Sequence, residues 1–276
     1  MKLNFSRLAQ YPAPLRLGIF ILTLGLLWAP FALPLHWFLR HDTNLATIVT
    51  MAILFVEFLI LLPLWGKKVY HLPSPFSHYG LSPTVTNGRE CLTGLIIGVV
   101  ITFDLFGLMV IFGWATLHPS PQVLQAATEG IFTALGVGFA EELFFRGWFL
   151  DELERDYRPN TVLWVNALIF AALHFIKPLS EMIRTFPQFP GLVLLGLNLV
   201  WSRWKYGGLG MAIGLHAGLI WGYYIINVGQ LIHYTDKVSP WITGVDRNPL
   251  AGLLGLIFLG FLMVWLGDAP RGSNTQ

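Results

Sequence analysis

The sequence predicts an all-α membrane protein that crosses the bilayer about eight times. Of its 276 residues, 55% are hydrophobic and only 12% are charged, and the mean hydropathy is +0.62. A soluble domain carries roughly 25% charged residues, so this chain has too little charge to cover a globular surface that faces water. The apolar residues also form successive runs of about 20, the length at which a helix crosses a hydrocarbon core of about 30 Å.

The apolar runs give eight candidate spans, with a polar, proline-containing segment between the second and the third. The first run continues past Pro30 and Pro34 without a small-residue cleavage site, so we expect a span there and not a signal peptide. The fifth and sixth runs are short, and could be tilted, re-entrant or lengthened by their flanks. Segment 66–90 is expected to form a surface loop. The spans lie at about 15–39, 45–65, 92–117, 122–150, 161–176, 188–202, 207–232 and 250–267.

Composition also excludes several classes of protein and site. Cys91 is the only cysteine, which excludes an intramolecular disulfide framework and a cysteine-based zinc site. The formal net charge of +2 gives no basic footprint for nucleic acid. No internal repeat is visible, so residues 1–276 are expected to form a single membrane domain, with the bilayer as their main partner.

The distribution of lysine and arginine predicts the orientation in the membrane, because cytoplasmic segments are enriched in both. With a cytoplasmic N-terminus, eleven basic residues fall on the inner side and five on the outer side. An even number of spans with both termini in the cytoplasm fits this bias best. The inner residues are Lys2, Arg7, Arg16, Lys67, Lys68, Arg89, Arg155, Arg158, Arg203, Lys205 and Arg271, and the outer residues are Arg40, Lys177, Arg184, Lys237 and Arg247.

The fourth span holds charged residues inside the predicted hydrocarbon core, where a charge is energetically unfavourable. Glu141 and Glu142 are adjacent, and Arg146 follows in the same apolar segment. An ionisable side chain inside a span costs several kcal/mol, so each is a candidate for function. Because Glu142 and Arg146 are four residues apart, they share one helical face and suit an ion pair. Glu141 lies about 100° around the helix and is left free for another partner.

Two histidines in other spans are predicted to lie at a similar depth. Glu141 and His174 should each lie roughly 20 Å from the inner face, and His216 roughly 14 Å, at 1.5 Å per helical residue. Three ionisable side chains on the fourth, fifth and seventh spans therefore fall in one layer of the membrane. We expect them to converge on one site.

Three motifs in this order resemble those of a known family. Glu141-Glu142-x-x-x-Arg146, then Phe170-x-x-x-His174, then His216 in a glycine-rich helix are similar to the motifs of the CPBP family. This family comprises the CAAX prenyl endopeptidases and the bacteriocin-processing and immunity-type proteins often called Abi. Its core has eight helices, with the motifs on the fourth, fifth and seventh. The resemblance identifies 120–230 as the motif-bearing core of a CAAX-protease-like bundle.

The resemblance implies an intramembrane endopeptidase that cleaves a membrane-associated peptide or protein. It implies Glu141 as general base, His174 as the residue that positions the water, and His216 as oxyanion stabiliser. Glu142 and Arg146 are then supporting residues. A second version binds a divalent metal through Glu141, His174 and His216, since two histidines and a carboxylate form a plausible zinc set with an open position. The sequence leaves both versions open, with no cofactor or with zinc.

One departure from the family pattern leaves other functions open. The family usually has asparagine, or a similar polar residue, four positions after the third-motif histidine, and this chain has Ile220. Isoleucine donates no hydrogen bond to an oxyanion. A catalytically silent member that acts as a scaffold or immunity factor is therefore the main alternative. A transporter is a further one, because intramembrane carboxylates and histidines also form proton relays.

Overall fold

A computed structural model describes residues 5–118 and 120–267. Helices dominate it, and packing divides the chain into two compact units. Among the described residues, one unit comprises 5–79 and 151–157, and the other comprises 80–118, 120–150 and 158–267. The single membrane domain expected from hydropathy stays a prediction, because both units contain helices long and apolar enough to cross a bilayer.

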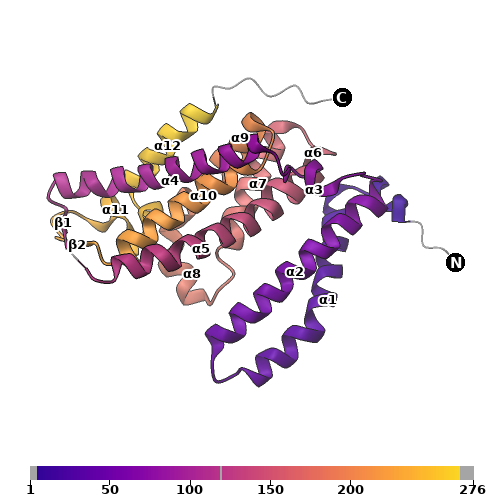
Figure 1. The fold of residues 1–276 in the computed structure, drawn as a ribbon, viewed down its shortest axis with the longest axis horizontal. Coiled ribbons are helices and arrows are strands. Elements are labelled where there is room, and N and C mark those ends of the chain that lie inside the picture. The colour runs from indigo at the N-terminus through magenta and orange to yellow at the C-terminus, as the bar shows by residue number, and fades with distance from the viewer. Residues whose placement is uncertain (1–4, 119, 268–276) are drawn as a thin grey trace. The chain divides into compact units, whose positions relative to one another are not determined.

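The N-terminal unit is a helical hairpin. A 3₁₀ turn, Phe5–Gln10, precedes α1 (Ala13–Phe38), which packs along α2 (Thr43–Val69), and the short helix α3 (Pro75–His78) follows (Figure 1). α2 begins where the side chain of Asp42 accepts a hydrogen bond from the Leu45 amide, a common N-cap arrangement. Much of the outer surface of α1 and α2 is exposed leucine, isoleucine and phenylalanine, as expected where lipid is the solvent.

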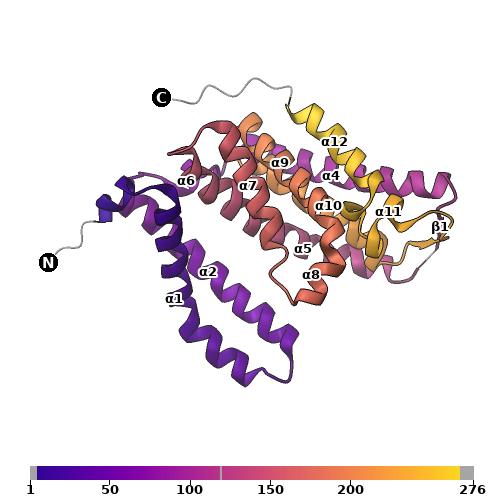
Figure 2. The same ribbon diagram turned by 180° about the vertical axis from the view of Figure 1, so that it is seen from behind.

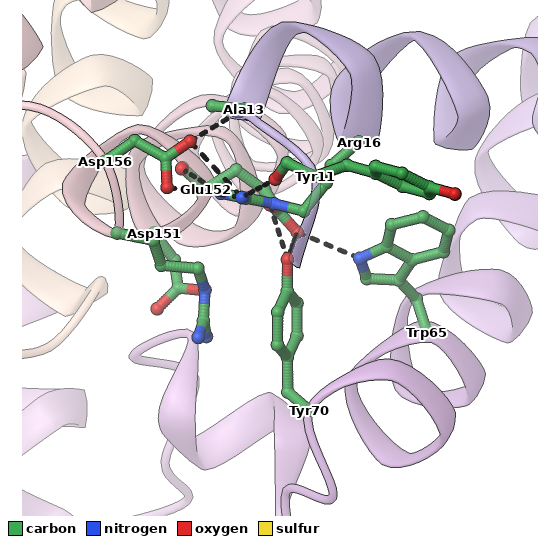
Figure 3. A network of polar contacts seen from close by, with 9 residues as sticks. Tyr11, Ala13, Arg16, Trp65, Tyr70, Asp151, Glu152 and Asp156 are labelled. Carbon is green, nitrogen blue, oxygen red and sulfur yellow. Dashed lines mark hydrogen bonds and ion pairs between the residues drawn. The ribbon is translucent and has the colours of Figure 1, made fainter. Parts of the chain in front are cut away.

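A buried polar cluster holds segment 151–157 within this unit. The Glu152 carboxylate accepts hydrogen bonds from Arg16 Nε at 2.8 Å, from Trp65 Nε1 at 2.9 Å and from the Tyr70 hydroxyl at 2.7 Å (Figure 3). Arg16 Nη1 also reaches Asp156 at 3.2 Å. Burial, and then the neighbouring Glu152 charge, raise the pKa of Tyr70.

The second unit is a bundle built around α10. α4 (Val85–Ile111) and α5 (Val123–Glu142) both pack against α10 (Gly210–Tyr223), and α7 (Pro159–Leu173) and α12 (Leu253–Gly267) pack on α9 (Phe189–Tyr206) (Figures 1 and 2). The backbones of α4 and α10 approach so closely that a Cβ on Gly214 would lie 1.9 Å from the Cys91 carbonyl oxygen. Glycine at this position therefore allows the contact, as small residues do between membrane helices.

Shorter elements complete the second unit. α5 continues into a π-helical segment, Leu143–Phe149, and then into α6 (Leu150–Glu154), whose residues from Asp151 onward belong to the N-terminal unit. α10 continues into a second π-helical segment, Tyr224–Val228. Strand β1 (Ala115–Leu117) pairs antiparallel with β2 (Ile232–Tyr234), with Thr116 opposite His233. The remaining elements are α8 (Leu179–Thr185), α11 (Pro240–Thr243) and 3₁₀ turns at Phe186–Gln188, Val245–Arg247 and Pro249–Ala251.

The structure confirms the all-α membrane class and refines the spans. Within the described residues, five helices are long and apolar enough to cross a membrane, and α7 and α12 are shorter apolar helices. The count of eight spans stays a prediction. The expected loop over 66–90 is wrong at both ends, because α2 continues to Val69 and α4 begins at Val85. The Thr84 side chain caps α4 by accepting from the Asn87 amide, a signal that a hydropathy window does not detect.

Candidate active site

The end of α5 places the two adjacent carboxylates of the first motif. Glu141 and Glu142 are its last residues, and the backbone then becomes π-helical over Leu143–Phe149. A π-helical turn is wider than an α-helical one and often marks a functional site. Asn166 of α7 donates to the Phe145 carbonyl at 2.8 Å and so ties α7 to this turn.

Glu142 is the centre of a fully buried ion pair and hydrogen-bond set. Its Oε1 accepts from Arg146 Nη1 at 3.0 Å and from His216 Nδ1 at 2.8 Å. Arg146 Nη2 also donates to the Gly196 carbonyl of α9 at 3.2 Å. The pairing of Glu142 with Arg146 was expected from their spacing, whereas the bond from Glu142 to His216 was not. Glu142 thus joins the first motif to the third.

The three candidate catalytic side chains meet around one carboxylate oxygen. Glu141 Oε2 lies 3.8 Å from His174 Nε2 and 4.0 Å from His216 Nε2. This oxygen is buried and has no hydrogen-bond partner among the described residues, although part of the Glu141 side chain is exposed. A buried acceptor without a partner is rare in native proteins. The arrangement leaves room for a donor, such as a water molecule, beside Glu141.

The hydrogen bond of the His174 imidazole fixes which of its nitrogens carries a proton. His174 Nδ1 lies 2.8 Å from the Phe170 carbonyl oxygen, which can only accept, so Nδ1 is the donor. A neutral His174 then presents an accepting Nε2 to Glu141. His174 lies just past the end of α7, at its C-cap, and not inside a span as the sequence suggested. His216, in contrast, is buried within α10.

The triad opens onto a cavity of about 360 Å³. Glu141, His174, His216 and Ile220 all line it. Most of the other walls are apolar, from α4, α5, α9, α10 and α12. Polar side chains that the sequence analysis did not assign to the site also reach it, and they are Thr102, Lys177, Gln188, Tyr223 and Asn248. Thr102, Gln188 and Asn248 lie far from the motifs in sequence, and for Lys177 and Tyr223, which lie near them, no local pattern shows that the side chain lines a cavity.

The triad was also tested as a metal site. Ligand atoms around a tetrahedral zinc ion lie about 3.4 Å apart, given bonds of about 2.0–2.1 Å. The separations from Glu141 Oε2 are longer, at 3.8 and 4.0 Å. Across residues 5–118 and 120–267, no group of three or more His, Cys, Asp or Glu side chains is placed to hold a metal ion. These separations do not support the zinc version of the site, which stays a prediction.

Comparison with known proteins places these residues in a family. Residues 123–221, which include all three motifs, match the model of the type II CAAX prenyl endopeptidases, Rce1-like. No curated protein and no solved structure matches the chain. Apolar helices of spanning length and this family match together make it an integral membrane protein. Through residues 123–221, the chain is similar to the Rce1-like type II CAAX prenyl endopeptidases, and this match supports a CPBP-family intramembrane protease.

Proposed function

We propose that this protein is an endopeptidase that cleaves a membrane-associated peptide or protein with a water molecule activated by Glu141. The observation that carries the proposal is the buried Glu141 Oε2, which has no hydrogen-bond partner within the part of the chain that the structure describes. It lies close to His174 Nε2 and His216 Nε2 on the wall of a largely apolar cavity. Such a cavity suits an apolar peptide, and the polar group at its wall supplies the chemistry.

The geometry supports a specific position for the water. Glu141 Oε2 and His174 Nε2 are both acceptors, so a water between them donates one proton to each. Its oxygen lone pairs then point away from these two residues and toward the cavity. As the water oxygen attacks the scissile carbonyl carbon, its proton passes to Glu141. Glu141 later delivers that proton to the leaving amine when the C–N bond breaks.

His216 supplies the donor for the oxyanion. Its Nδ1 donates to Glu142, whose charge Arg146 offsets. For Nε2 to donate as well, the proposal requires that both ring nitrogens of His216 carry a proton. That Nε2–H stabilises the negative oxygen of the tetrahedral intermediate. In this proposal, Glu142 and Arg146 act only through His216, as positioning residues.

Cleavage by the purified protein in detergent, read by mass spectrometry on a membrane-peptide library, tests this proposal. Glu141→Gln should abolish cleavage, because glutamine cannot accept the proton. Glu129→Gln is the matched control, because Glu129 is an exposed carboxylate on the same helix. EDTA should leave the rate unchanged. Cleavage that survives in Glu141→Gln would remove the proposed base, and loss of activity with EDTA would favour the metal version.

A catalytically silent scaffold or immunity factor is the second candidate function. One observation favours it, since Ile220 presents an apolar side chain to the cavity where the family usually has a polar one. Absence of cleavage across a broad library, in wild type and in Ile220→Asn alike, would support this alternative.

We also propose that both termini face the cytoplasm, on the basis of the eleven-to-five excess of basic residues on the inner side. Two of the eleven, Lys2 and Arg271, lie outside the described residues. Reporter fusions at either terminus test the orientation, and an outward-facing reporter would overturn it.

A further inference from the structure

Away from the triad, the polar side chains of the cavity offer donors. Asn248 Oδ1 accepts from the Leu250 amide at 3.0 Å, which leaves its amide nitrogen for the cavity. The Thr102 hydroxyl donates to the Gly98 carbonyl at 2.9 Å and is already used. Lys177 is the only cationic side chain other than the histidines that lines the cavity within the described residues. Glu141 is the only carboxylate that does so.

Lys177 lies three residues after His174, on the turn that leads to α8. Its ammonium lies 4.9 Å from the centroid of the Phe175 ring, and no carboxylate of the described chain lies within 4.0 Å of it. Glu181, four residues further along the chain, is bound to Arg184 at 2.6 Å. Within the described residues, the charge of Lys177 is therefore not neutralised by an ion pair.

An unneutralised ammonium beside an apolar cavity depends on water. Lys177 is half-buried, so water solvates it while the cavity is open. An apolar peptide that fills the cavity displaces this water, and burying a charge without a partner is costly. A peptide that brings a carboxylate to Lys177 avoids this cost, because a charge-assisted hydrogen bond replaces the lost solvation. The cavity should therefore distinguish substrates by charge.

We propose that Lys177 is a specificity-determining residue that binds a carboxylate of the peptide substrate, with the Gln188 and Asn248 amides as further donors in the same cavity. This inference rests on the proposed endopeptidase function. The carboxylate comes from the C-terminus of the cleaved chain or from an aspartate or glutamate side chain. The two sources share one chemistry, and matched peptides distinguish them.

The experiment uses the full-length protein in detergent and the best-cleaved library sequence, made as a C-terminal acid and as a C-terminal amide. A second pair of amidated peptides carries Glu or Gln at each position in turn. Wild type should prefer the carboxylate form of one pair. Lys177→Met should raise KM for that form about 10- to 100-fold, with kcat nearly unchanged, because the contact is made in ground and transition states alike.

Two further variants separate charge from shape. Lys177→Arg keeps the charge and should keep most of the preference, and Lys237→Met is the control, an exposed lysine of the same unit outside the cavity lining. Equal KM values for all matched peptides in wild type would overturn the proposal. So would a Lys177→Met variant that weakens the acid and the neutral peptides equally.

A binding measurement keeps the test independent of turnover. Fluorescence anisotropy with the same labelled peptides and the Glu141→Gln protein should show the carboxylate preference, and Glu141→Gln/Lys177→Met should lose it. The endopeptidase proposal fails in a different way. It is contradicted if cleavage does not depend on Glu141, or if no cleavage is seen at all. Equal binding of acid and neutral peptides by Glu141→Gln would overturn the role of Lys177 even then.

Discussion

The two units each contain a buried arginine–glutamate pair, and the two pairs differ in how completely their hydrogen bonds are satisfied. In the N-terminal unit, both oxygens of Glu152 accept hydrogen bonds, from Arg16, Trp65 and Tyr70. In the second unit, Glu142 Oε1 accepts from Arg146 and His216, while Glu142 Oε2 has no partner in the described chain.

The difference separates a structural network from a reactive one. A buried acceptor without a partner costs free energy, so a network that exists only to stabilise the fold is expected to saturate its acceptors, as Glu152 does. The site around Glu141 leaves both Glu141 Oε2 and Glu142 Oε2 unpartnered among the described residues. Free hydrogen-bonding capacity of this kind is what a water molecule or a substrate requires.

The largest effect is expected when Glu141 and Glu152 are each replaced by glutamine. Glu141→Gln should lower the cleavage rate by about 10³-fold or more, the upper range for loss of a general base, without lowering the thermal unfolding midpoint. Glu152→Gln should lower the unfolding midpoint and leave the cleavage rate of the folded protein nearly unchanged, since the amide cannot accept hydrogen bonds from all three donors, Arg16, Trp65 and Tyr70. Activity and thermal unfolding are measured on the same detergent preparations. Equal effects of the two variants on both quantities would contradict the division into structural and reactive networks.

The arginines of the two pairs provide the next comparison. Arg16→Met and Arg146→Met each leave a buried carboxylate uncompensated, which is expected to destabilise by about 3–5 kcal/mol. Only Arg146→Met should also lower kcat in the fraction that remains folded, because Glu142 positions His216. Denaturant unfolding in mixed micelles measures the first effect, and activity per folded molecule the second. Normal stability of Arg146→Met would show that the Glu142 pair contributes little to folding.

Substitution of Ile220 is expected to have a smaller effect, and to raise kcat and not lower it. Loss of one oxyanion donor costs about 10²–10³-fold in rate, so Ile220→Asn should raise kcat by up to about 10²-fold if the new amide reaches the oxyanion beside His216. Ile220→Leu is the control for altered packing. An unchanged kcat in Ile220→Asn, in an enzyme that cleaves through Glu141, would mean that another cavity donor already occupies this role.

The candidate triad could be predicted from sequence because its members break the local pattern. A carboxylate or imidazole in an apolar run stands out, and Glu141, His174 and His216 were found in this way. Glu152 did not stand out, because it lies at the polar end of a span beside other charged residues. Lys177 was counted only as a basic residue of a loop, since nothing local shows that this loop lines a cavity.

Backbone geometry also limited how much of the site could be predicted from the sequence. The π-helical segment after Glu142 has no distinctive composition, so the position of Arg146 relative to α9 could not be derived from spacing alone. The bond between Glu142 and His216 joins residues 74 positions apart, and only the packing of α5 against α10 creates it. Thr84, in contrast, is a readable helix cap that hydropathy ignores.

The smallest expected effect is a pH dependence of stability that arises in the hydrogen-bond network around Glu152. Burial, and then Glu152, raise the pKa of Tyr70 above its ordinary value of 10.0. The neutral hydroxyl is thus favoured in the folded state, and its contribution to stability is fully present below about pH 10 and is lost as the pH rises further.

The unfolding midpoint of wild type should exceed that of Tyr70→Phe at pH 8, and the gap should narrow between pH 10 and pH 11. Tyr157→Phe, which removes a more exposed hydroxyl of the same unit, should show a smaller gap at pH 8. A gap between wild type and Tyr70→Phe that widens at high pH would mean that the hydroxyl does not stabilise the fold by donating to Glu152.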